Sequence, residues 1–144
     1  MRRYYIFNVK EDILKLYKNS EDCLYLILKR IYEMKKEEIN FGFNLFNQLL
    51  LEFDKEKLNN DIFIKLHKKY SYSKNKELHI INDLFKDEIS TLIIHRTYMY
   101  IESTKNNTMF FMILKEYNIN YFICDFERDD YFFFHNLLVY NKVF

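Results

Sequence analysis

The side chains best suited to catalysis are thinly spread along this sequence. It holds four histidines, His67, His79, His95 and His135, and no two of them have the H-x-H or H-x-x-x-H spacing of a metal-binding pair. A histidine beside a carboxylate can act as a general acid or base, so His79 or His95 would suit a small hydrolase or transferase. Both lie in expected strands, where a hydrogen-bonded structural histidine is the commoner role. The sequence therefore favours a protein that is not an enzyme, with the hydrolase or transferase as the alternative.

Nucleophile and phosphate-binding motifs are equally scarce. Gly42 is the only glycine, which excludes the glycine-rich loops of P-loop and dinucleotide-binding proteins and the G-x-S-x-G nucleophile turn. Cys124 lies in the apolar run ICDF, which predicts a buried thiol with a raised pKa. Four acidic residues gather near one turn: Asp125, Glu127, Asp129 and Asp130. They predict a solvated turn, because the glycine of a calcium-binding loop is missing. We expect neither a metal nor a cofactor.

The charge of the chain indicates no polyanionic partner. It has 22 basic and 21 acidic residues and a formal net charge of +1, so no overall attraction to nucleic acid or to an anionic membrane is expected. The basic pairs at 2–3, 35–36 and 68–69 are dispersed, and Glu37 and Glu38 directly follow the second pair. This pattern is typical of a solvated surface. A nucleic-acid-binding module is the weakest alternative, and it would appear as salt-sensitive retention on DNA.

Length and composition predict one folded domain over residues 1–144. Hydrophobic residues make up 49% and charged residues 30%, a balance that excludes an intrinsically disordered chain. No apolar run approaches the roughly 18 residues of a membrane span, and the opening MRRYYIFNVK lacks a signal-peptide cleavage site. Two cysteines are too few for a disulfide framework. We therefore expect a soluble, cytoplasmic protein.

Hydrophobic periodicity predicts the elements that must position any site. A β-branched and aromatic run predicts a strand over 3–9, and apolar residues at helical spacing predict helices over 10–19, 20–34, 35–53 and 54–69. The polar segment 71–76 is expected to be a loop. We then expect a helix over 105–117 and strands over 77–81, 91–96, 98–102, 119–126 and 131–134. The fold class is α/β, with a central, mostly antiparallel or mixed sheet of five to six strands packed by about five helices.

The helix expected over 35–53 has more apolar surface than one sheet can cover. One stripe is suited to packing on a sheet: Ile39, Phe43, Phe46 and Leu50. Phe41 and Leu45 form an i, i+4 pair on roughly the opposite side, about 200° from Ile39. Gly42 costs the helix about 1 kcal/mol relative to Ala, and it permits another helix to approach closely, from inside the domain or from a partner.

A second apolar pair, Ile13 and Tyr17, occupies the helix expected over 10–19. Two interpretations remain open for these surplus apolar residues. In the first interpretation, neighbouring helices cover these residues. In the second interpretation, the residues form an exposed aromatic patch that docks another protein.

Three segments of the sequence resemble a known family. They are YYIFNVKEDILKLY at 4–17, IYEMKKEEINFGF at 31–43 and FICDFERDDYF at 122–132, and together they resemble SirA, the sporulation inhibitor of replication proteins of bacteria. The resemblance spans nearly the whole chain and keeps the order of the elements. It implies a single α/β domain with helices on a central sheet, and a non-enzymatic activity. That activity is binding to the N-terminal domain of the replication initiator DnaA, which blocks initiation.

The resemblance also implies which residues bind the partner. Tyr17 keeps the tyrosine of the family, and Phe41 stands where the family has another aromatic residue. Ile13 replaces a phenylalanine and Glu38 replaces a glutamine, while Leu45 is expected as a flanking apolar contact. Of these residues, Ile13, Tyr17 and Phe41 are also among the surplus apolar residues, whereas Glu38 follows from the resemblance alone and Leu45 from the apolar surplus alone.

Overall fold

An antiparallel sheet forms the centre of the computed structural model, which describes residues 1–137. Its strands are β1 (Arg2–Val9), β2 (Leu50–Leu51), β3 (Tyr72–Asn75), β4 (Leu78–Asp83), β5 (Glu88–Ile94), β6 (Met99–Ser103), β7 (Phe122–Asp125) and β8 (Asp130–Phe133). The helices are α1 (Glu11–Leu16), α2 (Glu21–Tyr32), the 3-10 helix η1 (Lys36–Glu38), α3 (Ile39–Leu49), α4 (Lys55–Leu66) and α5 (Met109–Leu114). Residues 134–137 are also helical.

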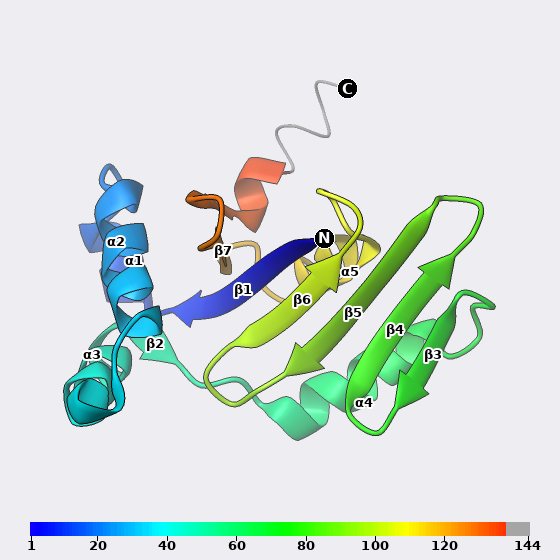
Figure 1. Ribbon diagram of the computed structural model, residues 1–144, viewed down its shortest axis with the longest axis horizontal. Coiled ribbons are helices and arrows are strands. Elements are labelled where there is room, and N and C mark those ends of the chain that lie inside the picture. The colour runs from blue at the N-terminus through cyan, green and yellow to red at the C-terminus, as the bar shows by residue number, and fades with distance from the viewer. Residues whose placement is uncertain (138–144) are drawn as a thin grey trace.

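The first strand of the chain lies in the interior of the sheet. The strand order is β3-β4-β5-β6-β1-β7-β8, and β2 pairs with the end of β1. All these pairings are antiparallel. β1 pairs with β6 from Arg2 to Ile6 and with β7 from Tyr5 to Phe7. The N-terminal strand therefore joins two hairpins, β5–β6 and β7–β8, that come much later in the sequence (Figure 1).

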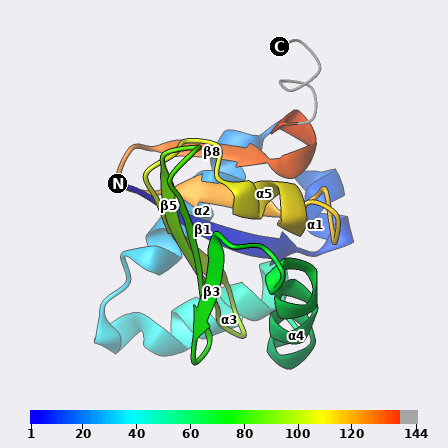
Figure 2. The same cartoon turned by 90° about the vertical axis from the view of Figure 1, so that its right-hand side faces the viewer.

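The sheet separates two hydrophobic cores. Tyr4 and Ile6 of β1 belong to the core that includes residues of α4 and α5, whereas Phe7 and Val9 belong to the core that includes residues of α2 and α3. This division follows from the two-residue period of a strand. Figures 1 and 2 show α4 and α5 against one face of the sheet, with α2 and α3 gathered at one end of the molecule.

The helix starts have local causes. Asp54 caps α4 by accepting a hydrogen bond from the Lys57 backbone N–H at 3.3 Å. Thr108 caps α5 in the same way, and the Glu88 carboxylate accepts from the Met109 N–H at 3.2 Å. α5 therefore begins at Met109, whereas the sequence predicted a start at residue 105. Ser20 is the N-cap of α2, although its side chain makes no capping hydrogen bond.

The expectation that segment 71–76 is a loop was wrong. Most of this segment forms strand β3. β3 lies at the edge of the sheet and pairs only with β4. An edge strand buries little side-chain surface and is typically polar, so its sequence lacks the apolar alternation by which strands are recognised. Ser73, Lys74 and Asn75 are accordingly exposed.

The α/β class and the antiparallel sheet are confirmed, with two corrections in number and length. The described residues form eight strands rather than five or six, because β2 and β3 were missed. The helix expected over 35–53 is shorter: it ends at Leu49, and Leu50–Leu51 pair with Asn8 and Val9 of β1 as strand β2. The five expected helices correspond to α1–α5, and η1 is additional.

Three turns use residues other than glycine in the left-handed region of backbone space. Lys76, Asp87 and Asp129 have φ values of 57°, 53° and 50°. Each lies in the turn of a hairpin: β3–β4, β4–β5 or β7–β8. A left-handed conformation costs a residue with a Cβ atom roughly 1–2 kcal/mol. The single glycine, Gly42, lies in α3, so these three turns have left-handed residues with a Cβ atom and bear the cost of that conformation.

Candidate functional site

α3 has two apolar faces, as its sequence predicted. Its buried residues are Gly42, Phe46 and Leu49. Phe41 projects from another side and is 55% exposed, and Leu45, one turn later, is half-buried. Glu38 lies three residues before Phe41 on the same side. We call Glu38, Phe41 and Leu45 the Phe41 face.

The stripe expected to pack on the sheet is only partly buried. Phe46 and Leu50 are buried, but Ile39 and Phe43 are 66% and 60% exposed. The physical reason is that Gly42, and not Phe43, is directed at α2. Ile39 and Phe43 instead line a hollow of about 310 Å³ together with Ile31, Met34 and neighbouring residues.

Gly42 allows α2 and α3 to approach each other closely. A Cβ atom at this position would lie 2.7 Å from Met34 Sδ and 4.0 Å from Ile31 Cγ2. Met34 lies two residues after the end of α2, and Ile31 belongs to α2. The close approach is therefore made inside the chain, and this resolves the choice that the sequence left open.

The second apolar pair, Ile13 and Tyr17, belongs to α1 and its C-terminal end rather than to α3. Ile13 and Tyr17 are half-buried and pack against the core beneath α2. The backbone N–H of Lys10, just before α1, donates to the carbonyl of Leu49, the last residue of α3, at 3.0 Å. α1 therefore begins where α3 ends, and both helices lie at the same end of the molecule (Figure 1).

The five sequence-predicted residues thus fall into two separate groups. Ile13 and Tyr17 belong to α1 and the core below it, while the Phe41 face belongs to α3. Glu38 also faces α2, because its carboxylate lies 3.6 Å from the Arg30 guanidinium. Both side chains are substantially exposed, so this ion pair stabilises the fold by less than about 1 kcal/mol. It places the carboxylate of Glu38 beside α2.

The sequence interpretation missed two exposed leucines near these helices. Leu16 of α1 is 69% exposed and Leu26 of α2 is 59% exposed. The helical wheel would have found Leu26, because it lies about 200° from the buried Leu28. Leu16 follows Ile13 by three residues, a spacing that places the two side chains next to each other on one side of a helix.

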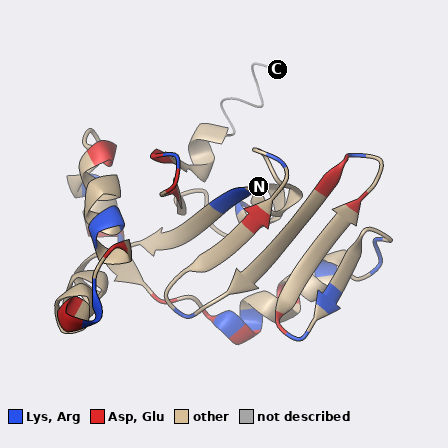
Figure 3. Cartoon of the chain, in the orientation of Figure 1, with Lys and Arg blue, Asp and Glu red and all other residues tan. Residues whose placement is uncertain are grey.

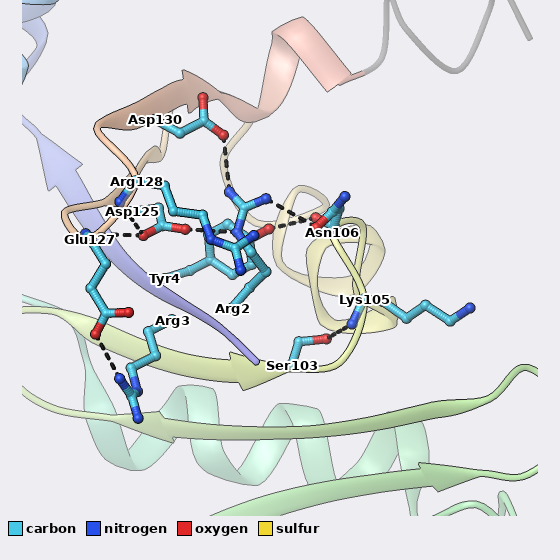
Figure 4. A network of polar contacts seen from close by, with 10 residues as sticks. All are labelled: Arg2, Arg3, Tyr4, Ser103, Lys105, Asn106, Asp125, Glu127, Arg128 and Asp130. Atoms are coloured by element: carbon cyan, nitrogen blue, oxygen red, sulfur yellow. Dashed lines mark hydrogen bonds and ion pairs between the residues drawn. The ribbon is translucent and has the colours of Figure 1, made fainter.

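The acidic turn between β7 and β8 is held by cations rather than simply solvated. Arg2 donates to Asp125 at 2.7 Å and to Asp130 at 3.1 Å, and Arg3 donates to Glu127 at 2.6 Å (Figure 4). Asp129 accepts from Lys29 at 2.6 Å and from the Tyr25 hydroxyl at 2.7 Å. The hydrogen bond from Lys29 is the main reason that the pKa of Asp129 is lowered. The acids thus anchor the turn to β1 and α2.

The comparison with protein families decides which group of proteins this is. The model of the sporulation inhibitor of replication protein SirA matches residues 2–137, which is nearly all of the sequence. The chain belongs to the SirA family. Among curated proteins, none matches the chain. The resemblance seen in three short segments is therefore confirmed over the whole match, and the SirA family consists of regulatory inhibitors of replication in sporulation.

A regulatory role agrees with the surroundings of His79, the stronger candidate for catalysis in this SirA family member. Its side chain is fully buried, and its ring nitrogens lie 2.8 Å from Asn59 Oδ1 and 2.8 Å from the Tyr72 hydroxyl. Burial lowers the pKa of His79 to about 4. A sealed, neutral imidazole with both nitrogens in hydrogen bonds cannot exchange protons with a substrate. His79 is a structural histidine, as expected.

The remaining candidates for chemistry, His95 and Cys124, are half-buried and buried, respectively. His95 is half-buried, and its ring lies 4.6 Å from the Tyr98 ring. Burial raises the pKa of the Cys124 thiol well above its usual value, as its apolar strand predicted. Within residues 1–137, no group of three or more His, Cys, Asp or Glu is arranged to hold a metal ion. No helix in this part of the chain has both the length and the apolar character needed to cross a bilayer.

Proposed function

We propose that this SirA family member binds the N-terminal domain of the replication initiator DnaA and thereby inhibits initiation. The binding surface is the Phe41 face of α3 together with Ile13 and Tyr17 of α1. The observation that carries the proposal is the exposure of Phe41. An aromatic ring on a helix, turned away from both cores and 55% exposed, is typical of a residue that becomes buried in a complex.

The two aromatic residues contribute to binding in different ways. Phe41 presents most of its ring to solvent, and burial of that surface supplies hydrophobic free energy on binding. Tyr17 is half-buried and packed on the core, so it presents a rigid edge whose position is already fixed in the free protein. Binding then costs little side-chain entropy at this point. Ile13 and Leu45 flank the aromatic residues with aliphatic surface.

Glu38 provides a polar contact at the rim of the surface. Its carboxylate is held beside Arg30 at 3.6 Å, which adds a cation to the same rim. Charged groups at a rim contribute more to the choice and orientation of the partner than to affinity. Glu38 is therefore a specificity group in this proposal, and the aromatic residues supply most of the affinity.

The mechanism is stoichiometric occupation rather than catalysis. One inhibitor covers the surface that one initiator uses for its own assembly or for recruiting other proteins, and the concentration of competent initiator falls accordingly. A standard interface of about 800 Å² per partner is sufficient for stable binding.

The test is a calorimetric titration of the full chain with the N-terminal domain of DnaA from the same organism. Phe41→Ala and Tyr17→Ala should each weaken binding by more than about 1 kcal/mol, or roughly fivefold and above, with the fold intact by circular dichroism. Phe85→Ala is the matched control. It removes the same ring from an 89% exposed position in the turn between β4 and β5. That turn lies at the other end of the molecule from α1 and α3 (Figure 1), so affinity should be unchanged. Unchanged affinity in both the Phe41 and Tyr17 variants would remove α1 and α3 from the interface.

A further inference from the structure

A hollow of about 290 Å³ opens where α2, α3, β1, β2 and the turn between β5 and β6 meet. Its aromatic side chains come from four of these parts of the chain: Tyr5 and Phe7 from β1, Tyr32 from α2, Phe46 from α3 and Tyr98 from the turn. Three aliphatic residues and Thr97 complete the lining. We call this cavity the tyrosine hollow. It is built by segments that are distant in sequence, so no local pattern predicted it.

Contacts between rings hold the walls of the tyrosine hollow in place. The ring of Tyr5 lies 5.1 Å from the ring of Tyr32 and 5.6 Å from that of Tyr98, measured between centroids. Phe126 stacks on Tyr32 with the centroids 4.6 Å apart, and the His95 ring lies 4.6 Å from Tyr98. Each of these two tyrosines is thus supported by a ring that does not line the hollow. The walls are already formed in the free protein, which lowers the entropy cost of binding a ligand.

No charged side chain lines the tyrosine hollow. The only polar groups of its lining side chains are the hydroxyls of Thr97 and of the three tyrosines. Burial raises the pKa of Tyr5 above its ordinary value, so this hydroxyl is neutral at physiological pH. A charged ligand would lose its hydration here without meeting an opposite charge.

The nearest lining charges belong to the neighbouring hollow beside Ile39 and Phe43. The two hollows share Ile31, Phe46 and Thr97 as lining residues. The charged residues that line the neighbouring one are Lys35 and Lys36, which are exposed and coloured blue between α2 and α3 in Figure 3. These lysines remain in water and do not line the tyrosine hollow.

We propose that the tyrosine hollow binds a neutral, flat aromatic small molecule that carries hydrogen-bonding groups at its edge. Aromatic rings pack favourably on other rings in offset and edge-to-face arrangements, and the four hydroxyls can donate to such a ligand or accept from it. A largely apolar cavity with a few polar groups is typical of small-molecule sites. The volume of about 290 Å³ lies at the lower end of the range for such sites, about 300 to 1,000 Å³, which indicates a ligand of one or two rings.

This site is separate from the proposed DnaA-binding surface. None of the residues that line the tyrosine hollow belongs to the Phe41 face or to the pair Ile13 and Tyr17. The inference therefore does not depend on the proposed function. A ligand in the hollow and a protein on α1 and α3 contact different side chains.

The test is a titration of the full chain with N-phenyl-1-naphthylamine, a neutral aromatic probe whose fluorescence increases in an apolar site. We expect saturable binding of one probe per chain. Indole should displace the probe at least about threefold more effectively than cyclohexanol, because only indole can pack ring on ring. Indole-3-acetate, an anion at pH 7, should displace it at least about tenfold less effectively than indole.

Two variants and a matched control locate the bound probe. Thr97→Trp fills the hollow and should abolish binding, and Tyr32→Ala removes a wall residue that is 49% exposed and should weaken binding at least about threefold. Tyr70→Ala removes a 74% exposed tyrosine between α4 and β3 and should leave binding unchanged. Near-ultraviolet circular dichroism checks that each variant is folded.

Three results would overturn the proposal. The first is the absence of saturable probe binding to the natural chain. The second is equal binding to the Thr97→Trp and Tyr70→Ala variants, which would place the probe elsewhere. The third is displacement of the probe by the N-terminal domain of DnaA, because the hollow would then belong to a protein interface and not to a small-molecule site.

Discussion

Arg2 and Asp125 are 123 positions apart in sequence, and Arg2 Nε donates to Asp125 Oδ2 at 2.7 Å. Only 12% of the Arg2 side chain and 2% of the Asp125 side chain are exposed. Arg2 also donates to Asp130 and to Asn106. The guanidinium therefore connects the start of β1 to the β7–β8 hairpin and to the segment before α5. These contacts help to hold the first strand between elements that come much later in the sequence.

Removal of this guanidinium should destabilise the fold strongly. Arg2→Met leaves the buried Asp125 carboxylate without its cation, and we expect the free energy of unfolding to fall by about 3 kcal/mol in urea denaturation. Arg3→Met is the matched control, because Arg3 is 47% exposed where it pairs with Glu127 and Glu102. Its loss should cost less than about 1 kcal/mol. Equal losses in the two variants would show that burial of the pair is not what matters.

His79 should make stability depend on pH between pH 6.5 and pH 4. The pKa of His79 is about 4 in the folded protein, against an ordinary value of 6.5. As pH falls through this window, the unfolded chain takes up a proton that the folded chain excludes, so the free energy of unfolding decreases. The loss contributed by this residue is up to about 3 kcal/mol at acidic pH. Urea denaturation at several pH values measures it, and His79→Gln should flatten the slope. An unchanged slope would mean that the ring is protonated in the folded state.

Gly42 should tolerate a small side chain but not a large one. Gly42→Ala gains about 1 kcal/mol of helix propensity, which is offset by the contact of its Cβ with Met34 Sδ at 2.7 Å. The sulfur is near the end of a flexible side chain and can move, so thermal denaturation should show a net change within about 1 kcal/mol. Gly42→Leu should cost more than about 2 kcal/mol, because it forces α2 and α3 apart.

A double-mutant cycle isolates that contact. With Met34→Ala already present, Gly42→Ala should stabilise the protein by the full helix-propensity gain of about 1 kcal/mol. If Gly42→Ala had the same effect with and without Met34, the two residues would not be in contact.

Lys76 should be replaced by glycine with a gain in stability. Its φ of 57° lies in the left-handed region, and Lys76→Gly should raise the free energy of unfolding by roughly 0.5–1 kcal/mol, since glycine has no Cβ to strain there. Lys74→Gly is the matched control, two residues earlier in the extended strand β3, where the same change should lower stability by a similar amount. Thermal denaturation of both variants should therefore show shifts of opposite sign.

Local sequence patterns predicted those parts of the fold in which one residue period dominates. The β-branched and aromatic run of β1 and the apolar spacing in α2 and α4 identified these elements correctly, because each of them must bury apolar side chains. β3 was missed for the opposite reason: an edge strand buries too little surface to need an apolar pattern. The start of α5 was misplaced because its capping carboxylate, Glu88, comes from a strand 21 residues earlier than Met109.

The same difference applies to the candidate site. The helical wheel placed Phe41 away from the buried face of α3, and its exposure confirms that placement. It placed Phe43 on the buried face, and this was wrong, because only the position of α2 selects Gly42 as the point of contact. The contact between Tyr70 and the β4–β5 turn gave no periodic signal, since these separate segments meet through Asp83.

The amino-acid sequence alone determined the family, the α/β class, the order of most elements and the absence of glycine-dependent phosphate motifs, because these depend on residue type and short-range spacing. The tertiary structure decided that Arg2 meets Asp125, that Gly42 faces Met34 and that Tyr70 meets the β4–β5 turn. These relationships depend on which segments the sheet order brings together, and that order results from cooperative burial of two cores, which no single stretch of sequence encodes.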